Sequence, residues 1–249
     1  MFEVDYYTYK IYDANDPEVA PAGYVARTNF SVSGQYGPRA GVVRYQEAVR
    51  VLDPLAASHS VTPRRIFNDL ARSFHNCVLG IDLRRPPFTE AGASGWFVDQ
   101  DFISRSSTSC SVVVQGVKPD ESASLTTMWT VLGYPPTGVA VPLWVDETLP
   151  PMVCMDNSLG TSPLSYESLQ LKDKVFSLKV GMGSERYMHW ALLYNEKGDG
   201  YMQRLAPVEE ENFRQAESLL EQWRRKNKVE REEMQALYRK LGKSMDLLN

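Results

Sequence analysis

A change of pattern at Pro207 is the sequence feature that most constrains how this chain can fold. Before it, short β-prone runs alternate with turns that contain proline or glycine. Residues 209–249 hold no proline, one glycine and many charges. Two apolar stripes at helical spacing lie in this last segment, joined near Asn227. The stripes are Ala216, Leu219, Leu220 and Trp223, and then Met234, Leu237, Tyr238 and Leu241. We therefore expect a sheet-rich unit over residues 1–206 and an amphipathic helical hairpin over 207–249, packed on it.

The β-prone runs of the first unit predict an α+β fold with mainly antiparallel sheets. Three of them, 107–115, 125–132 and 139–145, follow one another at the spacing of an antiparallel meander. Four further runs cover 2–11, 24–33, 175–180 and 188–194, and a surface loop is expected over 84–101.

Two helices are expected in the first unit. One covers about 45–52 and stops before Pro54, because a proline disfavours helical backbone in the residue before it. The other runs over about 62–76, with Thr62 as its N-cap and Pro63 as its first residue. Its core-facing residues are expected to be Ile66, Leu70 and Phe74.

Composition excludes several classes of function. The net charge of the 249 residues is −4, and the basic cluster at 224–228 alternates with glutamates, so we expect a solvated helical face and no nucleic-acid partner. No apolar run reaches 18 residues, so no membrane partner is expected. The first residues show no signal peptide, and the compartment stays open, export included.

The cysteines and histidines predict no metal site and no cofactor. The cysteines, Cys77, Cys110 and Cys154, form no Cys-x-x-Cys pair, and we expect all three to be free and mostly buried. The three histidines do not form a metal-binding motif, and the glycine-containing segment 181–185 lacks the lysine of a phosphate-binding loop.

Two segments hold candidate functional residues. Asn29 lies in the middle of a β-prone run, where asparagine is unfavourable; it marks either a bulge or an amide aimed at a developing oxyanion. Arg105 enters a strand that turns apolar; it is either a surface side chain or a fixed guanidinium in a cleft. Asp99 and Asp101 are an acid–base pair or, in the preferred interpretation, part of a polar loop.

These two segments together resemble the N-terminal-nucleophile amidohydrolases, in particular the acyl-coenzyme A:6-aminopenicillanic acid acyltransferase, penicillin V acylase and choloylglycine hydrolase group. The run Val25-x-x-Thr28-Asn29-Phe30 is similar to the family's strand with the oxyanion-hole asparagine, and Ser104-Arg105 to its later segment with the active-site arginine. The resemblance covers roughly residues 1–205.

The resemblance implies a four-layer αββα sandwich and a small-molecule amide substrate. Asn29 and Arg105 would be catalytic, and Thr28, Phe30, Ser104 and Trp129 would line the cleft. For Trp129 and the other tryptophans, core packing is the alternative.

The chain departs from the family at the nucleophile. The family uses a cysteine whose own α-amino group is the base, but residue 1 is methionine, and Cys77, Cys110 and Cys154 are internal. We therefore expect this chain to be the C-terminal part of a cysteine-type amide hydrolase or acyltransferase, inactive by itself. Its expected partner is the segment that carries the nucleophilic cysteine, or a second copy of the chain, because an open strand edge and a bare sheet face favour association. The alternative is a non-catalytic binding or scaffold protein that retains the fold.

Overall fold

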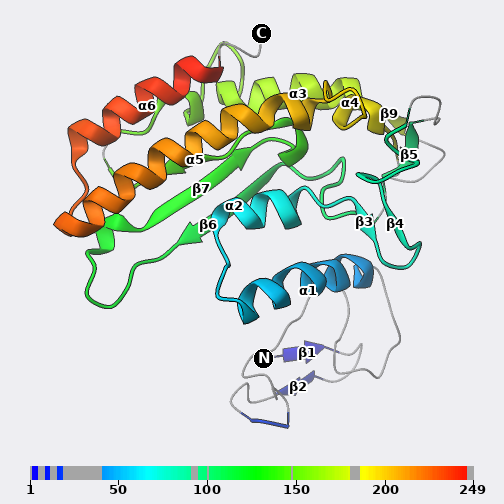
Figure 1. Ribbon diagram of the computed structural model, residues 1–249, viewed down its shortest axis with the longest axis horizontal. Helices are drawn as coiled ribbons and strands as arrows, with labels where there is room; N and C mark the ends of the chain where they lie inside the picture. Colours follow the sequence, from blue (N-terminus) through cyan, green and yellow to red (C-terminus); the bar gives the residue numbers. More distant parts are fainter. Residues whose placement is uncertain are drawn as a thin grey trace.

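The computed structural model describes residues 2–4, 9–11, 16–18, 41–90, 95–99, 101–146, 148–179 and 186–245 (Figure 1). These residues form a mixed α+β structure in which every strand pair is antiparallel, as predicted. The strands are β1 Phe2–Val4, β2 Tyr9–Ile11, β3 His75–Asn76, β4 Ile81–Asp82, β5 Trp96–Val98, β6 Cys110–Gln115, β7 Thr127–Leu132, β8 Val141–Leu143, β9 Phe176–Lys179 and β10 Arg186–His189. The α-helices are α1 Val42–Ala57, α2 Pro63–Arg65, α3 Pro163–Val175, α4 Trp190–Leu193, α5 Tyr201–Lys226 and α6 Arg231–Met245. In addition, η1 Ile66–Ala71 is a π-helix, and η2 Ala123–Leu125, η3 Pro135–Thr137 and η4 Pro151–Val153 are short 3₁₀-helices.

The predicted meander is confirmed as the sheet β6-β7-β8. Its register places Val113 opposite Trp129, and Trp129 opposite Pro142, so these side chains share one face of the sheet. The opposite face carries Val112, Val114 and Met128. A second three-stranded sheet has the order β5-β10-β9.

The C-terminal helical hairpin is also confirmed, and it covers the Trp129 face of this sheet (Figure 1). The Trp129 ring lies 4.5 Å from the Phe213 ring of α5, and both side chains are almost fully buried in the larger of two hydrophobic cores. Asn227 ends α5 in the left-handed conformation. The helix begins at Tyr201, six residues before Pro207, because the Gln203 side chain accepts the Gly200 N–H and starts the first turn early.

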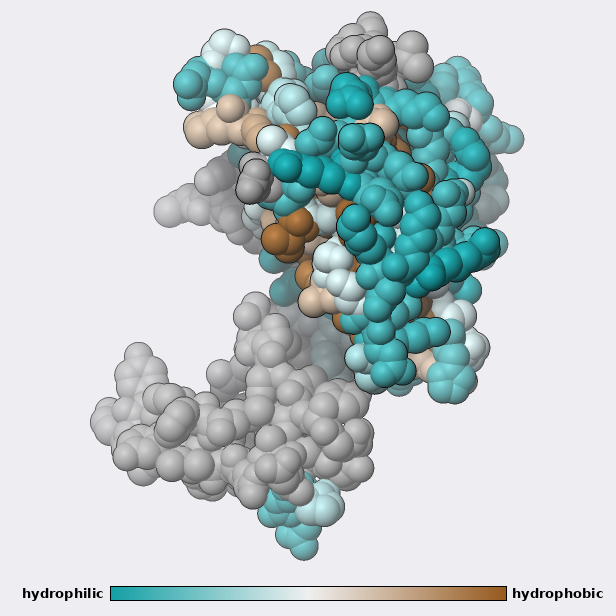
Figure 2. Space-filling model, turned by 90° about the vertical axis from the view of Figure 1, so that its left-hand side faces the viewer, coloured by the Kyte–Doolittle hydropathy of each residue, from teal (hydrophilic) through white to brown (hydrophobic). Residues whose placement is uncertain are grey.

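The outer face of the hairpin is hydrophilic, as expected (Figure 2). Its basic residues pair with glutamates: Arg224 lies 3.0 Å from Glu121, and Lys226 lies 3.8 Å from Glu230. Arg225 also pairs with Glu221. None of the described helices is long and apolar enough to cross a membrane.

Helix α1 is longer than predicted, because it continues through Pro54 to Ala57. The missing N–H of a proline removes one helical hydrogen bond, but here this happens in the last turns of the helix. The main-chain N–H and the hydroxyl of Ser58 both donate to the Pro54 carbonyl, at 3.1 and 2.8 Å, and hold the final turn.

The helix after Thr62 begins as predicted, with the Thr62 hydroxyl accepting the Arg65 N–H at 3.2 Å. It then becomes the π-helix η1 and ends at Ala71 rather than near residue 76. A π-helix has more residues per turn than an α-helix, which rotates the buried face. The predicted stripe is therefore wrong within the helix: Phe67 and Ala71 are buried, whereas Ile66 and Leu70 are partly exposed.

Several further elements differ from the prediction. Helix α3 was not predicted, although Ser162 and Pro163 are a helix start: the Ser162 hydroxyl accepts the Ser165 N–H at 3.3 Å. Strand β5 lies inside the expected surface loop and pairs with β10, and the run after Met188 turns into the short helix α4. The first β-prone run forms the two paired strands β1 and β2 instead of one strand. The predicted strand 24–33 lies outside the described residues.

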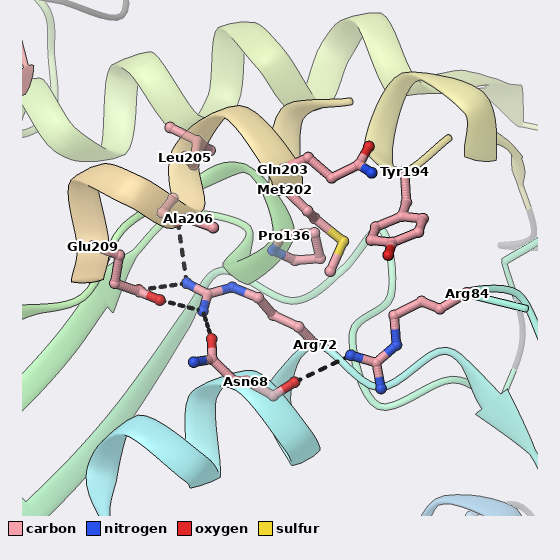
Figure 3. Close-up of a pocket in the computed structure, with 11 residues that line it drawn as sticks. Asn68, Arg72, Arg84, Pro136, Tyr194, Met202, Gln203, Leu205, Ala206 and Glu209 are labelled. Carbon is pink, nitrogen blue, oxygen red and sulfur yellow. Dashed lines mark hydrogen bonds and ion pairs between the residues drawn. The ribbon is translucent and has the colours of Figure 1, made fainter. Parts of the chain in front are cut away.

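A buried arginine joins η1 to α5 (Figure 3). All five N–H groups of Arg72 have an acceptor among the described residues, including both carboxylate oxygens of Glu209 at 2.6 and 2.7 Å. The other acceptors are Asn68 Oδ1 at 3.0 Å, the Pro135 carbonyl at 2.9 Å and the Gly138 carbonyl at 3.2 Å. Arg72 therefore fixes the helical hairpin to the rest of the fold.

Candidate active site

The predicted site residue Arg105 lies in the loop between β5 and β6. The Asp99 carboxylate at the start of this loop binds the main chain next to Arg105. Asp99 follows β5, and its N–H donates to the Arg186 carbonyl of β10 at 2.9 Å. Its Oδ2 accepts the Ser106 N–H at 2.6 Å. The side chain of Asp99 thus fixes the residue next to Arg105, and Asp99 is only 5% exposed.

The backbone of Arg105 is held on both sides. Its N–H donates to Thr108 Oγ1 at 3.1 Å, and its carbonyl accepts the Thr108 N–H at 2.8 Å. The hydroxyl of the preceding Ser104, which is buried, donates to the Ala71 carbonyl at 2.6 Å. These bonds fix the main chain at Arg105 without any contribution from its side chain.

The side chains of this loop contain an unpaired acceptor and an unpaired donor. Among the residues that the structure describes, Asp99 Oδ1 and Arg105 Nε are buried and have no hydrogen-bond partner. Buried polar atoms are paired in the great majority of cases, so two unpaired atoms in one loop require an explanation.

The charges around this loop are mostly positive. Burial raises the pKa of Asp99, against the opposing effect of Ser106 and the charges of Arg105 and Lys172. Burial and the charge of Arg186 lower the pKa of Lys172. The pKa of Arg44 is lowered by burial and by Arg105, and its guanidinium lies 3.2 Å from Asp101.

Tyr134 lies in the second, smaller core, close to Lys172 and Asp99. Its ring lies under the ammonium of Lys172, 5.7 Å from the ring centre, and burial together with the charge of Asp99 raises the pKa of its hydroxyl well above the ordinary value. Asp99, Arg105, Lys172, Tyr134 and Arg186 together are named the Arg105 cluster below.

The unpaired atoms of the Arg105 cluster are one donor, Arg105 Nε, and one acceptor, Asp99 Oδ1. An amide has the complementary groups, since its carbonyl oxygen accepts a hydrogen bond and its N–H donates one. Ionisable groups with perturbed pKa values that lie together are typical of functional sites.

The other predicted site residues have different positions. Ser104 lies beside Arg105, but its hydroxyl faces the interior and bonds to Ala71. Trp129 is packed in the larger core, which was the alternative to a position in the cleft. Its indole N–H donates to Gln115 at 3.1 Å. Thr28, Asn29 and Phe30 lie outside the described residues.

The sequence interpretation missed part of this cluster. It treated Asp99 as a polar loop residue, although Asp99 is buried. Lys172 and Tyr134 were not identified, because they come from α3 and from the turn after β7, which no local pattern connects to Arg105. The helix start at Ser162 was the one available signal for α3.

A second charged network lies apart from these residues in sequence and is fully paired. The buried Glu47 of α1 accepts from Arg50 at 2.7 and 2.6 Å, from His75 Nδ1 at 2.8 Å and from the Ser73 hydroxyl. Although burial opposes it, these bonds lower the pKa of Glu47. The network attaches α1 to β3.

The cysteines are free, as expected, but Cys110 is exposed, on the same face of β6 as Val112 and Val114. Cys77 and Cys154 are partly buried. In the described part of the chain, no group of three or more histidine, cysteine and acidic residues could hold a metal ion.

Comparison of the chain with protein-family models, with curated proteins and with solved structures found no match. Function is therefore inferred from the Arg105 cluster and from the sequence motifs alone.

Proposed function

We propose that this chain is the C-terminal part of a cysteine-type amide hydrolase or acyltransferase, with the Arg105 cluster on its substrate cleft. The observation that carries the proposal is the unpaired donor and acceptor of Arg105 and Asp99, which an amide group complements. Arg105 orients the substrate, and Asn29 donates to the developing oxyanion.

In the proposed reaction, the nucleophile is an N-terminal cysteine of polypeptide outside residues 1–249. Its α-amino group takes the proton of the thiol, and the thiolate attacks the amide carbonyl. The C–N bond breaks, the leaving amine receives the proton, and an acyl-enzyme remains. Water or an acceptor amine then takes the acyl group and restores the thiol.

The sheet β6-β7-β8 supports the proposal of a larger sandwich. Its Trp129 face carries a helical layer, which corresponds to two of the four layers of an αββα fold. On its opposite face the β8 side is buried at Val141 and Leu143, whereas toward β6 the side chains of Val112, Val114 and Met128 are 49%, 63% and 39% exposed. Burying these three neighbouring apolar side chains is favourable. We therefore propose that a second sheet packs against them, and that it comes from the cysteine-bearing segment or from a second copy of the chain.

The proposal is tested by expressing the complete reading frame, including any codons upstream of Met1, and measuring amine release from a panel of fluorogenic N-acyl amides. We expect activity in the complete product and none in residues 1–249 alone. Asn29→Ala is expected to lower kcat by about 10²–10³-fold, as the loss of an oxyanion donor does.

Arg105→Gln is expected to lower kcat/KM by about tenfold or more, since it removes hydrogen bonds from a charged group. Arg85→Gln is the matched control, because the Arg85 side chain is 79% exposed and its only described ion pair is at 3.7 Å with Asp82. Amide cleavage by residues 1–249 alone, or full activity of Asn29→Ala, would overturn the proposal.

The second candidate function is a non-catalytic binding module. The same unpaired atoms favour it, because they can hold an amide without any nucleophile. Saturable binding of an amide that Arg105→Gln abolishes, with no turnover by the complete product, would identify this function instead.

A further inference from the structure

A pocket separate in its residues from the Arg105 cluster lies where α5 meets η1 and η3 (Figure 3). Its volume is about 240 Å³. Its polar lining comes from Asn68, Arg72, Arg84 and Glu209, and its apolar lining includes Met202 and Ala206 of α5.

Arg84 supplies the unbalanced charge of this pocket. Arg72 and Glu209 neutralise each other through two short hydrogen bonds. Arg84 approaches Asp82 only at 3.9 Å, and Arg85 shares that same carboxylate at 3.7 Å. Within the described part of the chain, Arg84 and Arg85 therefore share one acidic partner.

The guanidinium of Arg84 also has donors to spare. Among the described residues, one of its five N–H groups reaches an acceptor, the main-chain carbonyl of Asn68, at the long distance of 3.5 Å. In Figure 3 the hydroxyl of Tyr194 points toward Arg84 across the pocket. A planar anion between them would receive the two-pronged guanidinium contact that arginine makes with carboxylates.

The remaining lining is suited to a short apolar group. Pro136, Met202, Leu205 and Ala206 line the pocket beside Arg84. A hollow of about 370 Å³ continues along α5 past Pro207 and Phe213, and it is also lined by Glu210, whose carboxylate pairs with Arg64. The groove thus has a cationic end at Arg84, an apolar wall beside it, and a mixed polar and apolar continuation along α5.

We propose that this groove binds a small monocarboxylate with a short apolar chain, with its carboxylate on Arg84 and its chain along α5. A cationic ligand is disfavoured, because the guanidinium of Arg84 is itself positively charged. A multiply charged phosphate is disfavoured, because Glu209 already occupies Arg72 and leaves one guanidinium for the ligand. The inference does not depend on the proposed function.

The test is a calorimetric titration of the full chain with hexanoate, hexanamide and inorganic phosphate. We expect saturable binding of hexanoate and at least about tenfold weaker binding of hexanamide, which has the same shape without the charge. Arg84→Gln should weaken hexanoate binding by about tenfold or more, and the neighbouring Arg85→Gln by less than about twofold.

The site is located independently by the methyl resonance of Met202 in protein labelled with ¹³C-methyl methionine, assigned with Met202→Leu. Hexanoate should shift this resonance. Absence of hexanoate binding, an unchanged Met202 resonance, or an equal shift of that resonance by hexanamide or phosphate would overturn the inference. The comparison of hexanoate with hexanamide uses the native chain, so it stands even if Arg84→Gln does not fold.

Discussion

Two groups of arginine and carboxylate in this molecule differ in how completely they are paired. Arg72 uses all five donors, and Glu209 also accepts the Ala140 N–H at 2.6 Å. Arg105 and Asp99 each keep one buried polar atom without a partner among the described residues. A fully paired group of this kind holds structure together, whereas an incompletely paired one keeps bonding capacity for a ligand. We therefore propose that pairing, more than burial or charge, distinguishes a structural arginine such as Arg72 from a candidate functional one such as Arg105.

The largest expected effect is at the paired group. Glu209→Ala leaves the Arg72 guanidinium buried without its counter-charge, and should lower the free energy of unfolding by about 3–5 kcal/mol. Urea denaturation followed by circular dichroism measures it. The control is Glu210→Ala on the exposed side of the same helix, which loses a surface pair with Arg64 and should cost no more than about 1 kcal/mol. Equal losses for the two variants would contradict the comparison.

A smaller loss is expected from Glu47→Gln, which weakens hydrogen bonds to charged groups and should cost about 1.5–3 kcal/mol at pH 7. The folded-state pKa of Glu47 lies below its ordinary value of 4.5. The ionised group therefore contributes stability above pH 4.5, and this contribution is lost as the pH falls through the folded-state pKa. Unfolding free energies of the native chain and the variant should converge in acid. A constant difference between pH 7 and pH 3 would show that Glu47 is not the titrating group.

The smallest effect, of opposite sign, is expected at the unpaired group. The folded-state pKa of Asp99 lies above its ordinary value of 3.8, so the folded protein binds the proton more tightly than the unfolded chain. The contribution of the protonated Asp99 carboxyl to stability is fully present below pH 3.8. This contribution is lost as the pH rises through the folded-state pKa. Asp99→Asn removes the buried charge and keeps an oxygen that can accept the Ser106 N–H, so it should raise the free energy of unfolding at pH 7. Destabilisation by several kcal/mol would place Asp99 among the structural groups.

The fold was predictable where a local pattern alone decides it. The meander and the C-terminal hairpin follow from turn residues and from stripes such as that of Leu237 and Leu241. The course of α1 past Pro54 was not predictable, because it depends on Ser58 closing the last turn. The π-helix of η1 was missed for a similar reason, since Phe67 packs against Phe213, which is 146 positions away.

The candidate site was predictable only in part. Arg105 was identified from its place before an apolar strand. Its neighbours Asp99, Tyr134 and Lys172 meet through tertiary packing of β5, β10 and α3, which short-range sequence patterns do not encode. The role of Asn29 stays a prediction, because Asn29 lies outside the described residues.

The account depends most on Asn29 and Arg105 serving one reacting group. The direct measurement is intramolecular cross-linking of Asn29→Cys with Arg105→Cys, after Cys77, Cys110 and Cys154 have been replaced by alanine. A bismaleimide of about 10 Å suits the test, since two side chains that each hydrogen-bond one small group at about 3 Å lie within its reach. The account predicts a rapid cross-link in this variant and little in the control that pairs Asn29→Cys with Arg85→Cys. No cross-link at Arg105→Cys, or an equal yield in the control, would contradict it.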